Sequence, residues 1–192
     1  MGNYDYAEEP YLIDLSILYR YTCIKHLLYW DGEVVMREYT ACFTGHRQIP
    51  FGQTILLRRR LDKVITDLVQ QGIIYYGAGG ALGFDTMAAQ AVLRARRNYP
   101  QVKLILVLPC PTQTDRWPER DKEVYEEIKT QADKVVYVSD HYTKSCMFLR
   151  NRHLVDHSGT CIAYLTEDNG GTAYTVNYAR SKGLRIINLA EM

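Results

Sequence analysis

The sequence lacks the cysteine pattern of a disulfide-stapled or zinc-binding domain. Its 192 residues include five cysteines, an odd number, and no two of them form a CxxC pair. A disulfide framework requires an even set of cysteines, and a structural zinc site usually shows closely paired ligands. We therefore expect neither a disulfide framework nor a metal site.

The chain also lacks an excess of charge of either sign. It contains 23 Lys and Arg residues against 22 Asp and Glu residues, so its formal net charge is +1. Proteins that bind the phosphate backbone of nucleic acids carry a clear basic surplus. A nucleic-acid partner is therefore disfavoured. The apolar share of 47% and the charged share of 23% are typical of an ordinary globular domain.

No uninterrupted apolar run is long enough to cross a membrane. The most apolar N-terminal segment, YLIDLSILYRYTCIKHLLYW, is broken by Asp14, Arg20, Lys25 and His26. It also lacks the basic start and the small-residue cleavage site of a signal peptide. We expect no membrane partner and a cytoplasmic location.

Residues 1–38 are interpreted as an N-terminal extension of the main domain, residues 39–192. Five apolar residues of this extension fall on one helical stripe: Ile13, Ile17, Tyr21, Ile24 and Leu28. One interpretation is a docking or dimer-forming helix, which would make the protein a homo-oligomer. The other is that Met36 is the true start of the chain, because it lies just ahead of the first convincing strand. The sequence leaves both interpretations open.

From Tyr39 onward, β-rich runs alternate with segments of helical periodicity. The expected strands are YTACFTG, IIYYG, VKLILVLP, KVVYVS, TCIAYL and LRIINL. Helices are predicted over residues 53–71, from about residue 83, and over residues 119–132, 144–156 and 172–182. No tight hairpin joins the strands, which indicates right-handed βαβ crossovers. The predicted fold is one doubly wound α/β domain with six mostly parallel strands and helices on both faces of the sheet.

Candidate binding residues follow the first strand. Doubly wound sheets bind ligands beyond the carboxyl ends of their strands. There, Gly45 lets the backbone turn, and His46 and Arg47 stand side by side. The Arg47 guanidinium can bind a phosphate or a carboxylate through two hydrogen bonds. The alternative is a structural turn with an exposed arginine.

A glycine-rich segment, GAGGALGFD, follows the second strand. Gly79, Gly80 and Gly83 belong to this segment, which exposes backbone N–H groups at the positive end of the next helix. The spacing is neither GxGxxG nor a P-loop, since no Lys-Ser/Thr pair follows. Asp85, in the first helical turn, either complements the helix dipole or accepts a hydrogen bond from a ribose hydroxyl.

Two further strand ends carry candidate residues. After the third strand, Gln113 offers an amide, and Trp117 offers a flat ring that either stacks on a base or packs as part of a lid. After the fifth strand, Gly170, Gly171 and Thr172 open the last helix as a second glycine-bearing helix N-terminus. Two such termini in one sheet favour a pocket for a phosphate or a nucleotide.

The helix predicted over residues 144–156 contributes the remaining candidates. It carries Arg150 and Asn151. Because a helix turns about 100° per residue, one of these two side chains is expected to face the end of the next strand. Asp156 ends this helix, where a capping or surface role is the default.

Five segments in order carry a family resemblance: CFTGHR, GGALGFDTMAAQAVL, LPCPTQ…W, RNRHLVDHS and GGTAYTVNYA. They resemble the YpsA-like proteins of Gram-positive bacteria and their phages. These proteins belong to the SLOG superfamily, which also contains the lonely-guy phosphoribohydrolases and the DNA-processing protein DprA. The resemblance extends from about Tyr39 to Leu189 and does not cover the N-terminal extension.

The resemblance implies a Rossmann-like fold and a pocket for a nucleotide-derived ligand of the NAD or ADP-ribose type, with no cofactor assigned beyond that ligand. YpsA-like proteins have been connected with cell-division control and stress responses, so we expect a binding or sensing module that acts through a protein partner. Carried over residue by residue, the pocket contains Gly45, His46, Arg47, Gly79, Gly80, Gly83, Asp85, Arg150, Asn151, Gly170, Gly171 and Thr172.

The resemblance has one departure. Lonely-guy hydrolases carry a glutamate shortly after their second glycine motif, and it serves the cleavage of the N-glycosidic bond. The matching residues here, 174–177, are Tyr-Thr-Val-Asn, and an asparagine cannot act as a general base. Catalytic residues therefore stay unknown, with Asp85 and Asp156 as candidates. Nucleotide binding or sensing is the first hypothesis, N-glycosidic hydrolysis the second, and single-stranded DNA binding as in DprA the third.

Overall fold

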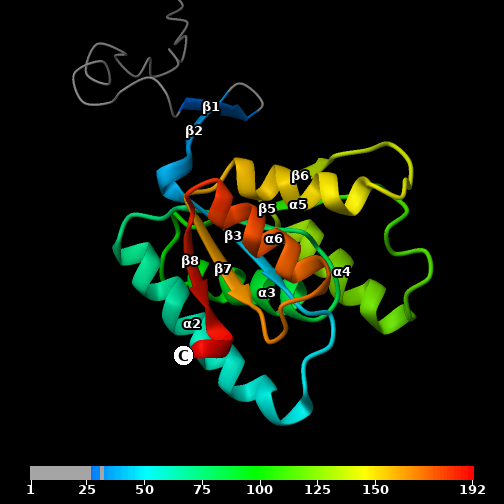
Figure 1. Cartoon of the computed structure of the whole chain (residues 1–192), viewed down its shortest axis with the longest axis horizontal. Helices are drawn as coiled ribbons and strands as arrows, with labels where there is room; N and C mark the ends of the chain where they lie inside the picture. The colour runs from blue at the N-terminus through cyan, green and yellow to red at the C-terminus, as the bar shows by residue number, and fades with distance from the viewer. Residues whose placement is uncertain (1–26, 31–32) are drawn as a thin grey trace, which may run out of the picture.

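A six-stranded parallel sheet forms the centre of the protein (Figure 1). The computed structural model describes residues 27–30 and 33–192. The strand order is β6-β5-β4-β3-β7-β8, and every neighbouring pair in this sheet is parallel. The strands are β3 (Thr40–Gly45), β4 (Tyr75–Ala78), β5 (Lys103–Leu108), β6 (Lys134–Tyr137), β7 (Thr160–Tyr164) and β8 (Arg185–Asn188). The predicted doubly wound α/β fold is confirmed.

Helices cover both faces of the sheet. Within the described part of the chain they are α2 (Thr54–Gln70), α3 (Phe84–Arg96), α4 (Glu119–Gln131), α5 (Cys146–Asp156) and α6 (Gly170–Ser181). The first three lie over one face, and α5 and α6 lie over the other (Figure 1). Short 3₁₀ turns, Phe51–Gln53 and Leu189–Glu191, precede α2 and follow β8.

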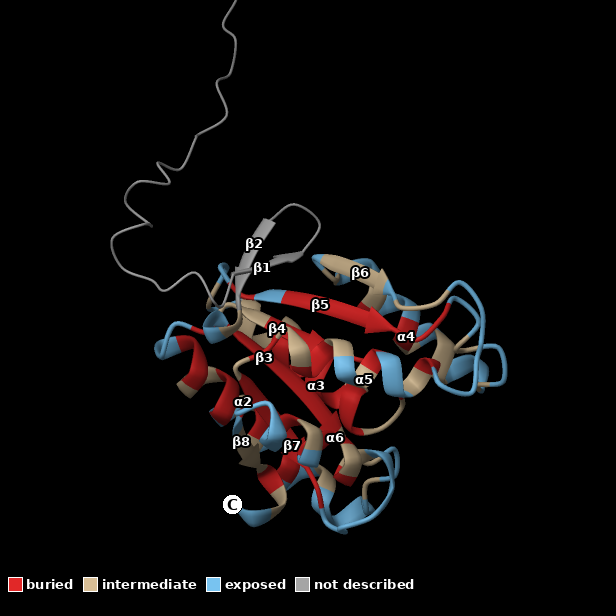
Figure 2. Ribbon diagram, turned by 45° about the horizontal axis from the view of Figure 1, so that its top comes forward, coloured by how far each residue is buried: buried red, intermediate tan, exposed pale blue. Residues whose placement is uncertain are grey.

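The two covered faces explain the apolar run of β5. Leu104, Leu106 and Leu108 point to the larger core under α2, α3 and α4, whereas Ile105 and Val107 point to the smaller core under α5. A strand buried on both faces needs apolar residues at every position, which the sequence supplies. Figure 2 shows the buried residues along the central strands and the inner sides of the helices.

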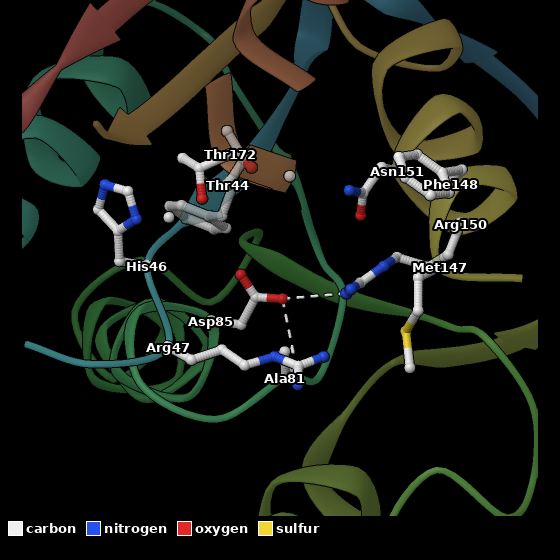
Figure 3. Close-up of a pocket in the computed structure, with 13 residues that line it drawn as sticks. Thr44, His46, Arg47, Ala81, Asp85, Met147, Phe148, Arg150, Asn151 and Thr172 are labelled. Atoms are coloured by element: carbon white, nitrogen blue, oxygen red, sulfur yellow. Dashed lines mark hydrogen bonds and ion pairs between the residues drawn. The ribbon is translucent and has the colours of Figure 1, made fainter. Parts of the chain in front are cut away.

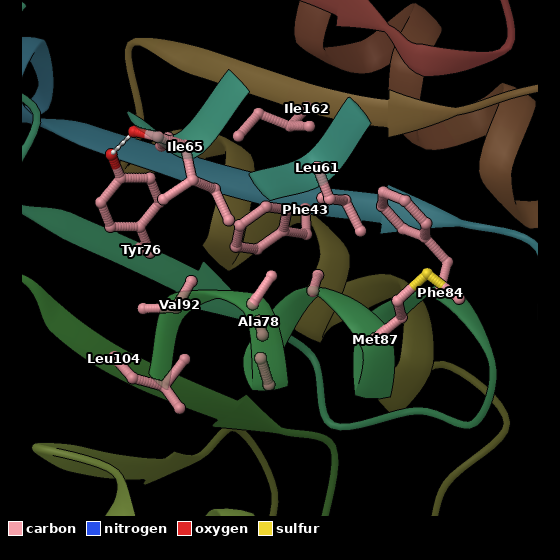
Figure 4. Packing of buried hydrophobic residues seen from close by; sticks show 14 of the residues in the cluster. Phe43, Leu61, Ile65, Tyr76, Ala78, Phe84, Met87, Val92, Leu104 and Ile162 are labelled. Carbon is pink, nitrogen blue, oxygen red and sulfur yellow. Dashed lines mark hydrogen bonds between the residues drawn. The ribbon is translucent and has the colours of Figure 1, made fainter. Parts of the chain in front are cut away.

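The larger core is organised around aromatic rings. The Phe43 ring lies 6.1 Å from the Tyr76 ring in a stacked arrangement and 6.4 Å from Phe84 in an edge-to-face one (Figure 4). The Tyr76 hydroxyl donates a hydrogen bond to the carbonyl of Ile65 on α2, 3.3 Å away. Burial raises the pKa of Tyr76, so this hydroxyl stays protonated and ties α2 to the sheet.

An antiparallel pair of short strands precedes the main sheet. These strands are β1 (Leu27–Trp30) and β2 (Glu33–Met36), and a 3₁₀ turn, Arg37–Tyr39, leads from them into β3. The helical stripe predicted over residues 13–28 lies outside the described residues, except for Leu28, which lies in β1. No helix of the described residues is long and apolar enough to cross a membrane.

The strand order reverses between β3 and β7. From β3 the chain continues through β4, β5 and β6 on one side, and then returns to place β7 and β8 on the other side. The loops that leave β3 and β7 therefore diverge at the carboxyl end of the sheet. Such a switch point leaves a crevice where ligands bind in doubly wound proteins.

Candidate functional site

A cavity of about 340 Å³ lies at this switch point (Figure 3). Its walls come from the loop after β3, the segment that opens α3, the first half of α5 and the N-terminus of α6. Segments far apart in the sequence thus meet there, as the sequence predicted. Of the predicted site residues, those that line the cavity are Gly45, His46, Arg47, Asp85, Arg150, Asn151, Gly171 and Thr172.

A buried ion pair forms one side of this cavity. Arg150 Nη1 donates a hydrogen bond to Asp85 Oδ2 at 3.0 Å, and the side chains are only 7% and 8% exposed. The same oxygen accepts the backbone N–H of Ala81 at 3.3 Å. Burial raises the pKa of Asp85, and the charge of Arg150 opposes that rise. Burial likewise lowers the pKa of Arg150, against the opposing charge of Asp85.

Gly79 makes room for the arginine of this pair. A Cβ atom at this position would overlap the guanidinium of Arg150 and come within 2.8 Å of Asp85 Oδ2. Gly79 therefore leaves space for the Arg150 side chain, but it does not itself line the cavity. Arg150 Nε is buried and has no hydrogen-bond partner among the described residues.

Gly83 brings the loop after β3 against the start of α3. Its φ of +76° belongs to the left-handed region, and a Cβ atom there would overlap the backbone carbonyl of Arg47. The N–H of Phe84 donates to the carbonyl of His46 at 3.1 Å. These contacts bring Arg47 close to the carboxylate of Asp85. The positive charge of Arg47 lowers the pKa of Asp85, whereas burial, the larger effect, raises it.

His46 and Arg47 differ in what they contact. The Nε2 atom of His46 accepts the N–H of Thr166 at 3.1 Å, so only Nδ1 remains to donate, and the ring packs edge to face on Tyr164 at 5.9 Å. The Arg47 side chain is exposed. Among the residues that the structure describes, none accepts a hydrogen bond from its guanidinium. Arg47 therefore has its full donor set available to a ligand.

The N-terminus of α6 opens onto the same cavity. Gly171 and Thr172 line it, whereas Gly170 is exposed outside it. The residue that precedes the helix, Asn169, makes no side-chain capping bond with the described residues. The first-turn amides are therefore not occupied by a cap, and an anion can take that place.

A second cavity, of about 710 Å³, shares His46 and Arg47 with the first. It lies between the loop after β3 and the loop after β7. Its remaining lining residues are Gln48, Ile49, Pro50, Gln53, Tyr164, Thr166 and Glu167. The Tyr164 hydroxyl donates a hydrogen bond to Gln53 Oε1 across it. Apart from His46 and Arg47, none of its lining residues was predicted from the sequence.

Several predicted residues lie outside both cavities. Trp117 packs edge to face on Tyr125 with ring centroids 5.6 Å apart, which corresponds to the packing alternative. Gln113 donates through Nε2 to the carbonyl of Gly80 at 2.6 Å and so holds the glycine-rich segment. Asp156 accepts the Tyr178 hydroxyl at 2.9 Å, away from the cavity lining. In the described part of the chain, no three His, Cys, Asp or Glu residues are grouped as metal ligands.

Part of the cavity wall was not predicted from the sequence. Thr44, Met147 and Phe148 also line it. Phe148 lies three positions before Asn151 on α5, and such a spacing puts two side chains on one helix face. This spacing is the signal that could have identified Phe148.

Comparisons with known proteins identify the family of this chain. Residues 42–186 match the family model YpsA, described as the YspA SLOG family. A UPF0398 protein of Bacillus pumilus is 30% identical over 128 residues, which are 65% of this chain and 69% of the relative. A UPF0398 protein of Bacillus cereus strain G9842 is 30% identical over 130 residues, 66% of this chain and 71% of the relative.

Two solved structures of the DNA-processing protein DprA share the fold. The Streptococcus pneumoniae protein gives a TM-score of 0.55 at 16% identity, over 77% of this chain and 48% of its own. The Helicobacter pylori protein, which has a described single-stranded DNA binding mode, gives 0.57 at 19% identity, over 77% of this chain and 63% of its own. This chain thus spans about half of the first protein and under two thirds of the second.

Proposed function

The chain belongs to the YpsA SLOG family, and we propose that it binds a nucleotide-derived ligand of the ADP-ribose or NAD type in the two cavities around Arg47. One observation carries the proposal. Arg47, whose guanidinium donates no hydrogen bond to the described residues, and the uncapped amides of α6 face one cavity that also contains a buried carboxylate. Donors for a phosphate and an acceptor for a sugar hydroxyl thus occur together.

The phosphate groups take the donor side of the site. The guanidinium of Arg47 presents two parallel N–H groups, the geometry that suits a phosphate. The backbone N–H groups of Gly171 and Thr172 add the positive end of α6. In this arrangement a diphosphate lies beside Arg47, at the border of the two cavities.

The ribose takes the acceptor side. Asp85 uses Oδ2 for Arg150 and for the amide of Ala81, and no donor among the described residues is bound to its other oxygen. Figure 3 shows this second oxygen turned away from Arg150. A ribose hydroxyl is the donor that suits it, as in other doubly wound nucleotide sites.

The two cavities favour a ligand with two halves. Their shared residues, His46 and Arg47, form a common border between volumes of about 340 and 710 Å³. Both volumes lie in the usual range of small-molecule sites, about 300–1,000 Å³. A mononucleotide fills one of them, whereas ADP-ribose or NAD extends past Arg47 into the second.

Binding is favoured over hydrolysis of an N-glycosidic bond. A general acid or base must exchange a proton with the substrate, and Asp85 is engaged by Arg150. Asp156 is engaged by Tyr178 and lies outside the cavity lining. Because the ligand is bound and not consumed, the proposal includes a protein partner that distinguishes the filled from the empty site, in stress response or cell-division control.

Calorimetric titration with ADP-ribose, NAD and AMP tests the proposal, with chromatography of each mixture for released base. We expect saturable binding, tighter for the two-part ligands than for AMP, and no released base. Absence of binding by all three would end the proposal. Released base that Asp85→Asn abolishes, in a variant that still melts cooperatively, would favour the hydrolase.

Single-stranded DNA binding is the remaining candidate, suggested by the DprA-like fold. The near-neutral net charge of +1 opposes it, because non-specific strand binding depends on many basic contacts with phosphates. We expect weak retention of an oligonucleotide in a filter-binding assay at physiological salt. Tight, salt-dependent retention would replace the small-molecule proposal.

A further inference from the structure

An aromatic side chain stands at the rim of the first cavity. Phe148 lines that cavity and is 47% exposed. Single exposed apolar residues are common on protein surfaces and by themselves need no explanation. Leu149, the next residue, is equally exposed and does not line the cavity. What sets Phe148 apart is its position on the cavity wall together with the way in which its ring is supported.

The ring of Phe148 is supported by α6. It packs edge to face on Tyr174, with centroids 5.2 Å apart and planes at 87°. The Tyr174 hydroxyl accepts hydrogen bonds from Arg152 Nε at 2.9 Å and Nη2 at 2.6 Å. The Phe148 ring thus packs on a tyrosine whose position is held by two hydrogen bonds. Stacking of a ligand on Phe148 therefore costs less conformational entropy than stacking on an unsupported side chain.

The support continues along the helix. The ring of Tyr174 is parallel to that of Tyr178, 6.4 Å away, and the guanidinium of Arg152 lies over both rings at 5.9 and 5.4 Å. The hydroxyl of Tyr178 donates to Asp156 on α5. Side chains from the two helices therefore form one connected row that ends in Phe148 at the cavity.

Asn151 presents a hydrogen-bond acceptor beside this ring. Its Nδ2 lies 2.9 Å from Thr175 Oγ1, and that hydroxyl gives its only proton to the carbonyl of Gly171 at 2.8 Å. Thr175 Oγ1 can therefore only accept from Asn151, which fixes the orientation of the amide. The carbonyl oxygen Oδ1 is left on the other side of the amide, in a residue that lines the cavity.

We propose that Phe148 and Asn151 form the base subsite of the first cavity: the base stacks on Phe148, and an exocyclic amino group donates to Asn151 Oδ1. The inference rests on the proposed function. Figure 3 shows Asp85 between Arg47 on one side and Phe148 with Asn151 on the other. In a nucleotide the ribose lies between the phosphate and the base, and the order of Arg47, Asp85 and the pair of Phe148 and Asn151 matches it.

Titration of the wild type and of Phe148→Ala with AMP, IMP and ribose 5-phosphate tests this subsite. We expect Phe148→Ala to weaken AMP about tenfold or more, as loss of a stacking ring does, and to leave ribose 5-phosphate unchanged. IMP, which has an oxygen in place of the amino group, should bind the wild type about tenfold more weakly than AMP. Asn151→Ala should remove that difference.

The outcomes separate this inference from the proposed function. If the wild type binds ADP-ribose or NAD but none of these three compounds, only the base subsite is overturned. If it also binds neither ADP-ribose nor NAD, both are overturned. If it binds AMP and Phe148→Ala leaves the affinity unchanged, or weakens AMP and ribose 5-phosphate equally, only the base subsite is overturned.

A matched control and a spectroscopic readout complete the test. Leu149→Ala removes an equally exposed apolar neighbour outside the cavity lining and should bind AMP as the wild type does. In Phe148→Trp, AMP should quench the added tryptophan fluorescence and ribose 5-phosphate should not. The same fluorescence response in Leu149→Trp would contradict stacking at Phe148.

Discussion

Arg150 Nη1 lies 3.0 Å from Asp85 Oδ2, and this contact connects the two helical layers of the protein. Asp85 belongs to α3, which covers one face of the sheet, and Arg150 belongs to α5, which covers the other. The pair is formed beyond the strand ends, where no strand separates the layers. Two charges so deeply buried are stabilised mainly by each other, so removal of one leaves the other without compensation.

Loss of the arginine should therefore destabilise the fold strongly. We expect Arg150→Met to lower the free energy of unfolding by about 3–5 kcal/mol at pH 7, because it leaves the carboxylate of Asp85 buried and unpaired. Urea denaturation measures this change. The double variant Asp85→Asn with Arg150→Met should recover part of the loss. A cost below about 1 kcal/mol for Arg150→Met would show that water reaches the carboxylate readily.

Gly79→Ala should disturb the same pair without removing a charge. The added Cβ overlaps the guanidinium of Arg150, and we expect a loss of about 1–3 kcal/mol or more of stability from overpacking. Gly171→Ala is the matched control, because a Cβ atom there meets nothing within 4 Å. It should retain wild-type stability in thermal melts. Equal melting temperatures for the two variants would contradict the close approach at Gly79.

The fold was predictable because its signals are local. The apolar stripe of residues 57–68 became the buried side of α2, and the continuous run of β5 became a strand covered on both faces. The stripe follows from the period of a helix. The continuous apolar run follows from burial of the strand on both faces. The order of the strands was not specified by these periods, although it determines where the crevice lies.

The site was predictable only in part, because side-chain exposure is set by distant neighbours. Trp117 and Phe148 are both aromatic residues near strand ends, yet Tyr125 covers the first and the second stays half exposed on the cavity wall. The helical period alone led us to expect one of Arg150 and Asn151 to face the site, whereas the family resemblance placed both there. Both line the cavity, because Gly79 leaves space for the long arginine side chain.

Acid should destabilise the protein through His153 on α5. Burial, and secondarily the His157 ring stacked 4.1 Å away, lowers the pKa of His153 from 6.5 to about 4, although Asp156 opposes the shift. The folded state therefore binds this proton more weakly than the unfolded state does. The contribution of His153 to stability is complete above about pH 6.5 and is lost as the pH falls from that value toward 4.

Urea denaturation of the wild type and of His153→Gln at pH 7.5 and pH 5 checks this expectation. The variant should lose less stability than the wild type between the two values, because its side chain takes up no proton. Identical losses in both proteins would assign the acid sensitivity to other groups.

Arg47→Ala should weaken the anionic ligand and leave the fold intact. The side chain is exposed and donates no hydrogen bond to the described residues, so its removal should not change urea denaturation. Loss of a charged hydrogen bond to phosphate should cost about 1.5–3 kcal/mol, roughly 10- to 150-fold in the affinity for ADP-ribose. Arg59→Ala, an exposed arginine of α2 outside both cavities, is the matched control for net charge. Arg47→Lys should recover only part of the affinity, since an ammonium group cannot form the paired contact. Equal titration curves for Arg47→Ala and the wild type would remove Arg47 from the site.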